Sequence, residues 1–387
     1  MEGSSMEIKY INTNDLLKSC IAEISSNEQI ALDLEFDKNL HRYGFNICLI
    51  QIQAGATSYL IDPLVKEMDY KQIFPLLEDP EIEKVVFAFG EDLRLLNSLS
   101  CFPKNIYDLN IATKLLDFEP GSLSRYLNEV LDLEIAKSAQ LSNWFTRPLT
   151  SAQTVYAAGD VQYLLALREV LNTRAGEKSM IEWIDEENAF FDTMKFEIDY
   201  SKAFIKEKDK KGFTEFQWHI YQKLLGKREV NAKKINRPSF QVMDTNFIKD
   251  MVHNKTILEE WDLKKGAHRS LKNQVVKDEL LNIYEEAENE AQNLSKTKWA
   301  KNKLDRINYV EHMDLKKKIE ALKKEYFKPI QSLVKRDYGL NASTFILSNK
   351  LIADIITNGG LSIPEYKKRL FAKYAIELNM DLTKFQL

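Results

Sequence analysis

The first half of the chain alternates short apolar runs with amphipathic segments. The apolar runs predict five strands, and the turn-forming residues 54–57 join the second of them to the third as a hairpin. Helical periodicity follows from residue 68 onward, between and after the later strands. The predicted strands span residues 29–36, 47–53, 58–61, 84–89 and 105–107. This order predicts an α/β domain, a mixed sheet flanked by helices, over residues 1–175.

The second half shows helical periodicity without convincing strand runs. An acidic helix and a charged linker are predicted over residues 176–212. Two all-α domains are expected to follow, at 213–292 and 293–387. The predicted helices there span 213–225, 247–254, 270–290, 312–327, 349–357 and 364–378.

Charge divides the chain in the same way. Residues 1–175 carry 15 Lys and Arg against 25 Asp and Glu, whereas residues 201–387 carry 37 against 25. An acidic first part suits metal binding, and a basic second part suits a polyanionic partner. A solvated basic helical surface without a partner would give the same count.

Composition narrows the setting. No apolar run is long enough for a membrane span. The N-terminus lacks the basic and apolar segments of a signal peptide. Cys20, Cys48 and Cys101 are odd in number and lack CxxC spacing, which favours a reducing compartment over disulfides or zinc. We therefore expect a cytoplasmic protein with no membrane association.

Two acids interrupt the first predicted strand. Asp33 and Glu35 are two residues apart, so both carboxylates point to one face of the strand. Like charges in a core strand are costly unless a cation lies between them, and Mg²⁺ or Mn²⁺ prefers such oxygen ligands. An edge strand with one face in water would explain the same pair without a metal.

Two further positions carry acids in matching settings. Asp92 follows the fourth predicted strand, where sites of α/β proteins usually form. Tyr156 and Asp160 are four residues apart and therefore share one face of the last predicted helix of this domain. A helix-start aspartate and a core tyrosine beside a surface aspartate are the alternatives.

The loop before that helix, 137–149, holds Lys137, Trp144 and Arg147. An aromatic ring and two cations in one loop are suited to bases and phosphates. A structural loop anchored by its tryptophan is the alternative. Phe36 and Gln51, on the first two predicted strands, complete the candidate substrate-binding set.

The order Asp-x-Glu-Phe, Gly-Glu-Asp-Leu and Tyr-x-x-x-Asp resembles the DEDD 3′→5′ exonucleases. The similarity covers about residues 6–175, is closest to ribonuclease D, and belongs to the tyrosine branch of that family. It implies a ribonuclease H-like fold with two divalent ions, Mg²⁺ or Mn²⁺. The implied metal ligands are Asp33, Glu35, Asp92 and Asp160, and Tyr156 would orient or deprotonate the attacking water.

Residues 216–285 resemble a helicase-and-RNase-D C-terminal (HRDC) domain, a nucleic-acid-binding bundle, and 305–380 resemble a degenerate second copy. The resemblance implies a 3′→5′ exoribonuclease that releases 5′-mononucleotides from single-stranded 3′ ends of structured small RNA precursors, transfer-RNA precursors among them. A Werner-type DNA exonuclease and an inactive nucleic-acid-binding module are the alternatives. A monomer is favoured.

Overall fold

The computed structural model describes residues 7–135, 139–196, 205–261, 263–293 and 303–387, which form two compact units. One unit combines the chain up to Glu35 with Ile47–Phe196 and Met313–Leu387, and the other combines Phe36–Asn46 with Glu197–His312. Within the described residues no helix has the length and apolar character to cross a membrane. The domain boundaries at 175, 212 and 292 stay predictions.

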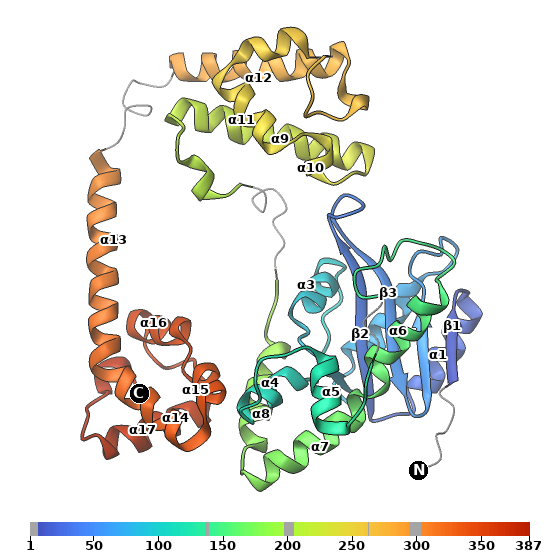
Figure 1. Cartoon of the computed structure of the whole chain (residues 1–387), viewed down its shortest axis with the longest axis vertical. Coiled ribbons are helices and arrows are strands. Elements are labelled where there is room, and N and C mark those ends of the chain that lie inside the picture. The colour runs from blue at the N-terminus through green and yellow to red at the C-terminus, as the bar shows by residue number, and fades with distance from the viewer. Residues whose placement is uncertain (1–6, 136–138, 197–204, 262, 294–302) are drawn as a thin grey trace. The chain divides into compact units, whose positions relative to one another are not determined.

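The first unit is built on one six-stranded mixed sheet (Figure 1). Its order is β1-β4-β3-β2-β5-β6, in which β1 runs parallel to β4, β3 runs antiparallel to β4, and β2, β5 and β6 run parallel. The strands are β1 Glu7–Ile11, β2 Gln29–Lys38, β3 Phe45–Ala54, β4 Thr57–Ile61, β5 Glu83–Val86 and β6 Ile106–Asp108. The sequence predicted five of these strands and missed β1, a short strand whose partner β4 lies far along the chain.

Helices flank this sheet, as the sequence predicted. α6 crosses one face, where Ala157 packs with Leu49 of β3 and Leu60 of β4 (Figure 1). Apolar side chains of α4 and α7 form one core with residues of β5 and β6. The helices of this region are α1 Asn14–Ile24, α2 Phe74–Glu78, α3 Gly90–Ser98, α4 Leu109–Leu115, α5 Leu123–Leu131, α6 Ser151–Gln162, α7 Leu164–Glu177 and α8 Ile181–Asn188.

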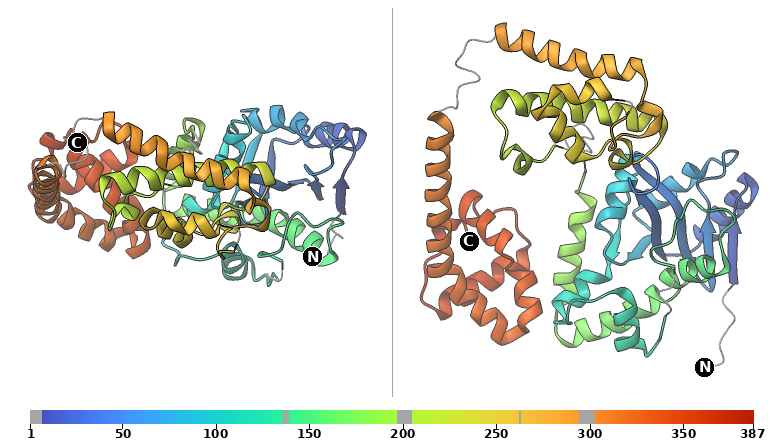
Figure 2. Two further views of the ribbon diagram at one scale, coloured as in Figure 1. Left: turned by 90° about the horizontal axis from the view of Figure 1, so that it is seen from above. Right: turned by 45° about the horizontal axis from the view of Figure 1, so that its top comes forward.

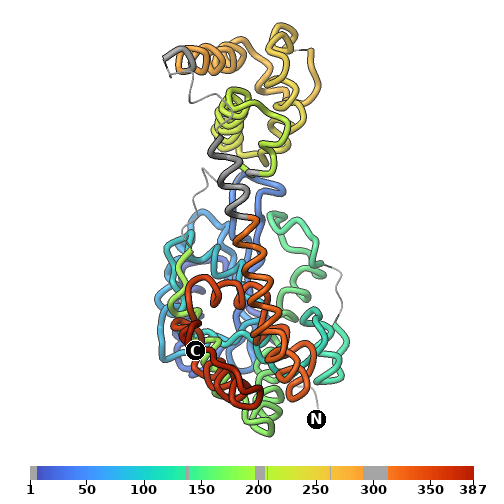
Figure 3. Tube along the Cα trace, turned by 90° about the vertical axis from the view of Figure 1, so that its left-hand side faces the viewer, coloured from blue at the N-terminus to red at the C-terminus, as the bar shows by residue number. Residues whose placement is uncertain are grey.

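From Met313 onward, the last helices of the chain belong to the same unit as the sheet. They gather at the C-terminal end of α13 (Figure 3). α15 packs on α4, and α17 packs on α8. Their bounds are α13 Lys303–Leu322, α14 Lys328–Tyr338, α15 Leu340–Ile346, α16 Asn349–Asn358 and α17 Glu365–Glu377.

The second unit contains a helical bundle with its own apolar core. Trp218, Leu224, Met251, Trp261 and Leu280 are among its buried residues. α9 and α12 lie alongside each other (Figure 2). The helices are α9 Glu215–Ile235, α10 Ser239–Val242, α11 Thr245–His253 and α12 Gln274–Asn293.

Candidate active site

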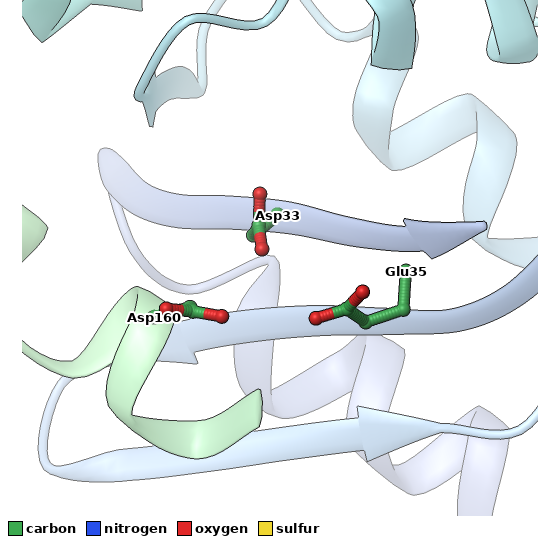
Figure 4. Close-up of side chains that lie close together, drawn as sticks. All are labelled: Asp33, Glu35 and Asp160. Carbon is green, nitrogen blue, oxygen red and sulfur yellow. The ribbon is translucent and has the colours of Figure 1, made fainter. Parts of the chain in front are cut away.

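Three of the four predicted metal ligands meet above the centre of the sheet. Asp33 and Glu35 project from β2 and Asp160 projects from α6, as Figure 4 shows. Each offers a carboxylate oxygen, and these oxygens all lie within 4.8 Å of one another. All three side chains are partly exposed, so the group can be reached from solvent.

Local sequence explains why these carboxylates converge. In β2 the apolar Leu32 and Leu34 are buried on one face, and the alternation of a strand places Asp33 and Glu35 on the other. α6 begins at a capping box in which Thr150 and Gln153 bond reciprocally, at 3.2 and 3.0 Å.

The fourth predicted ligand, Asp92, is outside this group but acts on it electrostatically. It lies in the first turn of α3, is 8% exposed, and its charge raises the pKa of Asp33 and of Glu35. The turn before α3 contains Ala88 at φ +57°, a strained conformation for a residue with a Cβ. The buried Asp108 carboxylate accepts the N–H groups of Ala88 and Phe89, at 2.8 and 3.1 Å.

Asp108 has two structural roles. Its side chain caps α4, because it accepts the N–H of Asn110 at the start of that helix. The hydrogen bonds to the turn before α3 were not predicted, because Ala88 lies 20 residues earlier in the chain. Through them Asp108 holds the turn that presents Asp92.

Burial and mutual repulsion dominate the electrostatics. Burial raises the pKa of Asp33, and the charges of Asp92, Asp160 and Glu35 raise this pKa further. Burial likewise raises the pKa of Glu35, Asp92 and Asp160. In the described structure the charged neighbours that shift these pKa values are acidic, so protons or bound cations must balance the charge.

Tyr156 lies one helical turn before Asp160 and donates a hydrogen bond to it, which lowers the Asp160 pKa against the effect of burial. Burial raises the pKa of the Tyr156 hydroxyl, and the charges of Asp160, Glu35 and Asp33 add to this. The hydroxyl is therefore protonated at neutral pH. Tyr156 and Asp160 also line a pocket with Ser122, Ser124 and Gln140.

The predicted substrate-binding residues have diverse surroundings. Trp144 is 4% exposed and packs with Leu49 and Ala157, its ring centroid 6.1 Å from that of Tyr156. Arg147 forms an ion pair with Asp62. Gln51 is fully buried, and its amide has no hydrogen-bond partner among the described residues.

Phe36 and Lys137 are the other two predicted substrate-binding positions. Phe36 packs edge-to-face against Phe45, at 5.1 Å between ring centroids. Lys137 lies outside the described residues.

The donor set fits a hard divalent cation. All the offered atoms are carboxylate oxygens, which Mg²⁺ and Mn²⁺ prefer over the nitrogen and sulfur ligands typical of zinc. A bound cation would also offset the repulsion that, after burial, raises the pKa of Asp33 and of Glu35.

Comparison with known proteins agrees with this geometry. Residues 8–175 match the family model described as 3'-5' exonuclease. Ribonuclease D of Pseudomonas paraeruginosa is 31% identical over 240 residues, which are 61% of this chain and 63% of that protein. Ribonuclease D of Bartonella henselae is 24% identical over 287 residues, 70% of each chain. The matched parts thus span 63 to 70% of these two curated relatives.

The fold has a counterpart among solved structures. The crystal structure of Escherichia coli RNase D has a TM-score of 0.70 at 22% identity, with 96% of this chain and 98% of that chain covered. The α/β exonuclease fold followed by helices, as the sequence predicted, is confirmed. Residues 8–175, which match the exonuclease family model, contain Asp33, Glu35, Asp92, Tyr156 and Asp160, and this chain is similar to ribonuclease D over 61 to 70% of its length.

Proposed function

We propose that this exonuclease removes 5′-mononucleotides from the 3′ end of RNA with the help of two divalent ions, Mg²⁺ or Mn²⁺. The observation that carries the proposal is the group of three carboxylates from β2 and α6 within 4.8 Å, beside the Tyr156 hydroxyl. The named relatives, which are ribonucleases, favour RNA as the substrate. Competition between matched RNA and DNA single strands tests this choice, and preference for DNA would overturn it.

The residues divide the work by position. Asp33, Glu35 and Asp160 would hold one ion, and Asp33 with Asp92 would hold the other. Such ions stabilise the negative charge that develops on the attacking and leaving oxygens of the phosphodiester. Asp108 keeps Asp92 in place through the turn before α3.

Tyr156 contributes an oriented hydroxyl. Its side chain packs on Trp144 and its hydroxyl bonds to Asp160, so the phenolic oxygen can accept a hydrogen bond from a water and direct a lone pair of that water toward phosphorus. If the phenol passes its own proton to Asp160, its oxygen can also take up the proton of the water. Burial and the neighbouring carboxylates both favour the protonated phenol, and neutralising the carboxylates would remove only their part of the rise in the Tyr156 pKa.

Tyr156→Phe is expected to slow hydrolysis by about a hundredfold, the usual scale for losing one positioned proton-transfer group. The folded structure should survive, because the ring that packs on Trp144 is retained. A gel time course on a 5′-labelled single-stranded RNA measures the effect as a slower ladder that shortens from the 3′ end. A variant that degrades RNA at the wild-type rate would remove Tyr156 from the mechanism.

The second unit supports structured RNA as the substrate class. Its bundle carries exposed cations at one end, where α9 runs into α10 and a backbone bridge joins Met243 to Ala267. Phe240, 53% exposed, lies among them as a stacking surface for a base. We name this set the basic end, and it consists of Lys233, Lys234, Arg237, Phe240, Lys265 and Arg269. It suits structured RNA precursors with a single-stranded 3′ end, such as those of transfer RNA.

Neutralising the five cations of the basic end to Gln is expected to weaken binding of long RNA and flatten its salt dependence. Each lost phosphate contact reduces the slope of log affinity against log salt by about 0.7 for single strands. Hydrolysis of short oligonucleotides should be unchanged. Lys18→Gln with Lys66→Gln, exposed lysines of the first unit, is the control. Equal slopes for the wild type and the variant would show that this end does not bind RNA.

A further inference from the structure

The guanidinium of Arg147 has all its donors engaged by the protein. Nε and Nη2 donate to the two carboxylate oxygens of Asp62, at 2.5 and 2.8 Å. Nη2 also donates to the carbonyl of Cys48, at 2.7 Å. Nη1 donates to the carbonyls of Trp144 and Thr146, at 2.9 and 2.8 Å. An arginine has five N–H donors, so no donor is left for a substrate phosphate.

Asp62 is a fixed partner for this arginine. Its side chain is 2% exposed, and the residue directly follows the last residue of β4. Beside Arg147, the carboxylate accepts the hydroxyl of Tyr10 and the N–H of Leu64. Hydrogen bonds from Arg147 and Tyr10 lower the Asp62 pKa against the effect of burial. The pair is therefore charged, and removing one member would strand the other in a largely desolvated position.

These contacts fasten the loop that leads into α6. Arg147 joins the loop carbonyls of Trp144 and Thr146 to the sheet, at Cys48 of β3 and at Asp62 after β4. The held loop carries Trp144 against the sheet, where the indole also contacts Ala157 of α6. Thr150 then begins α6 only three residues after Arg147.

We propose that the ion pair of Arg147 with Asp62 is a clamp that sets the position of α6, and with it Tyr156 and Asp160, relative to the carboxylates of β2. Arg147 is then a positioning residue and does not contact the RNA. This inference rests on the proposed exonuclease function. It replaces the prediction from the sequence that Arg147 binds substrate, because burial and hydrogen bonding assign its charge to Asp62.

The clamp predicts a particular pattern of kinetics. A small shift of a reacting group away from its productive position can lower the rate a hundredfold. A residue that only positions such groups should affect kcat and leave RNA affinity and its salt dependence unaltered. A substitution of a residue that contacts phosphate should instead lower RNA affinity and its salt dependence and leave kcat unaltered.

The test compares Arg147→Lys, Asp62→Asn and the double variant on a short 5′-labelled RNA. Lysine keeps the charge but loses the two-pronged contact, and asparagine keeps the shape but loses the charge. We expect kcat to fall about tenfold or more in both single variants, with KM within about twofold of the wild type. The kcat of the double variant should be no lower than that of the more impaired single variant, because both substitutions break the same interaction. Salt dependence of RNA binding, measured in EDTA, should match the wild type throughout.

Arg168→Lys is the matched control. Arg168 pairs with Glu83 at 2.6 Å with both side chains 17% exposed, but among the described residues no hydrogen bond of this pair involves the loop before α6. It should lose thermal stability as the clamp variants do while keeping kcat. The clamp is overturned if Arg147→Lys lowers RNA affinity and its salt slope while Asp62→Asn does not, or if both variants keep wild-type kcat. Failure of the wild type itself to degrade RNA would instead overturn the proposed function.

Discussion

Asp33→Asn is expected to lower the rate of RNA hydrolysis by roughly a thousandfold or more, the largest effect of any single substitution in this chain. Asp33 stands between Glu35 and Asp160, and its pKa is influenced by all three other acids of the site. An amide in its place loses the charge that would hold both ions. The measurement is the time course on 5′-labelled RNA with Mg²⁺, with Mn²⁺ and with EDTA.

The same variant should change how stability depends on metal and pH. Without divalent ions, the raised pKa values mean that the folded protein binds more protons than the unfolded chain from the ordinary carboxyl range up to the raised pKa. Stability is therefore lost as the pH rises through that window. Removing one charge should raise the metal-free Tm at neutral pH, by roughly a few degrees.

Mn²⁺ or Mg²⁺ should raise the Tm of the wild type and raise that of Asp33→Asn much less, because only the wild type keeps the full ligand set. Glu67→Gln, which removes an exposed charge far from the site along the chain, serves as the control. A variant with wild-type hydrolysis and a wild-type Tm response to Mn²⁺ would contradict the assignment of Asp33.

Two pairs of residues of the candidate site could be predicted from the sequence, because each pair follows the periodicity of its strand or helix. Asp33 and Glu35 share a face since a strand repeats every two residues, and Tyr156 and Asp160 share one since a helix repeats every three to four. That the side chains of β2 and α6 converge could be predicted only from the order of the motifs along the chain, through the family resemblance. Spacing alone could not show it, because Asp160 lies far along the chain from the strand that it faces.

The roles of the loop residues depended on burial, which spacing does not reveal. Trp144 and Arg147 in a polar loop are equally typical of an RNA contact and of a structural anchor. The ion-pair partner of Arg147 is Asp62, which lies 85 residues away in the sequence. In the sequence Asp62 only follows a predicted strand, so nothing there indicates that it binds Arg147. Burial is hidden from the sequence in the C-terminal helices too. Their many lysines suggest an exposed basic surface, but Lys367 is only 6% exposed.

The C-terminal helices are joined to the exonuclease fold by both apolar and polar contacts. Tyr366 stacks on Trp183 at 4.8 Å, and Lys367 pairs with Glu187 at 2.8 Å. Apolar residues of α14, α15 and α17 share one core with α4 and α7. The Asp117 carboxylate accepts the N–H groups at the start of α15, which follows Gly339 at φ +97°.

A chain that ends at residue 312 is therefore expected to lose cooperative unfolding and precipitate, because the deletion bares the apolar core and leaves Glu187 without its cation. Replacing residues 205–302 with a flexible Gly/Ser linker should leave the exonuclease fold and short-RNA hydrolysis intact, since that bundle has a core of its own. Thermal denaturation followed by circular dichroism compares the two deletions.

Gly339→Ala gives the same test without a deletion. A Cβ at this residue would lie 1.8 Å from the Asp117 carboxylate, so this carboxylate must shift and its hydrogen bonds to the start of α15 are disturbed. Gly226→Ala, where a Cβ meets nothing within 4 Å, is the control and should be neutral or stabilising. If the chain ending at 312 unfolds at the wild-type Tm, and Gly339→Ala behaves like Gly226→Ala, the C-terminal helices are only attached to the catalytic fold. If both variants are destabilised, these helices are structural parts of the catalytic fold. Only the bundle of α9 to α12 can then be deleted to test its part in RNA binding.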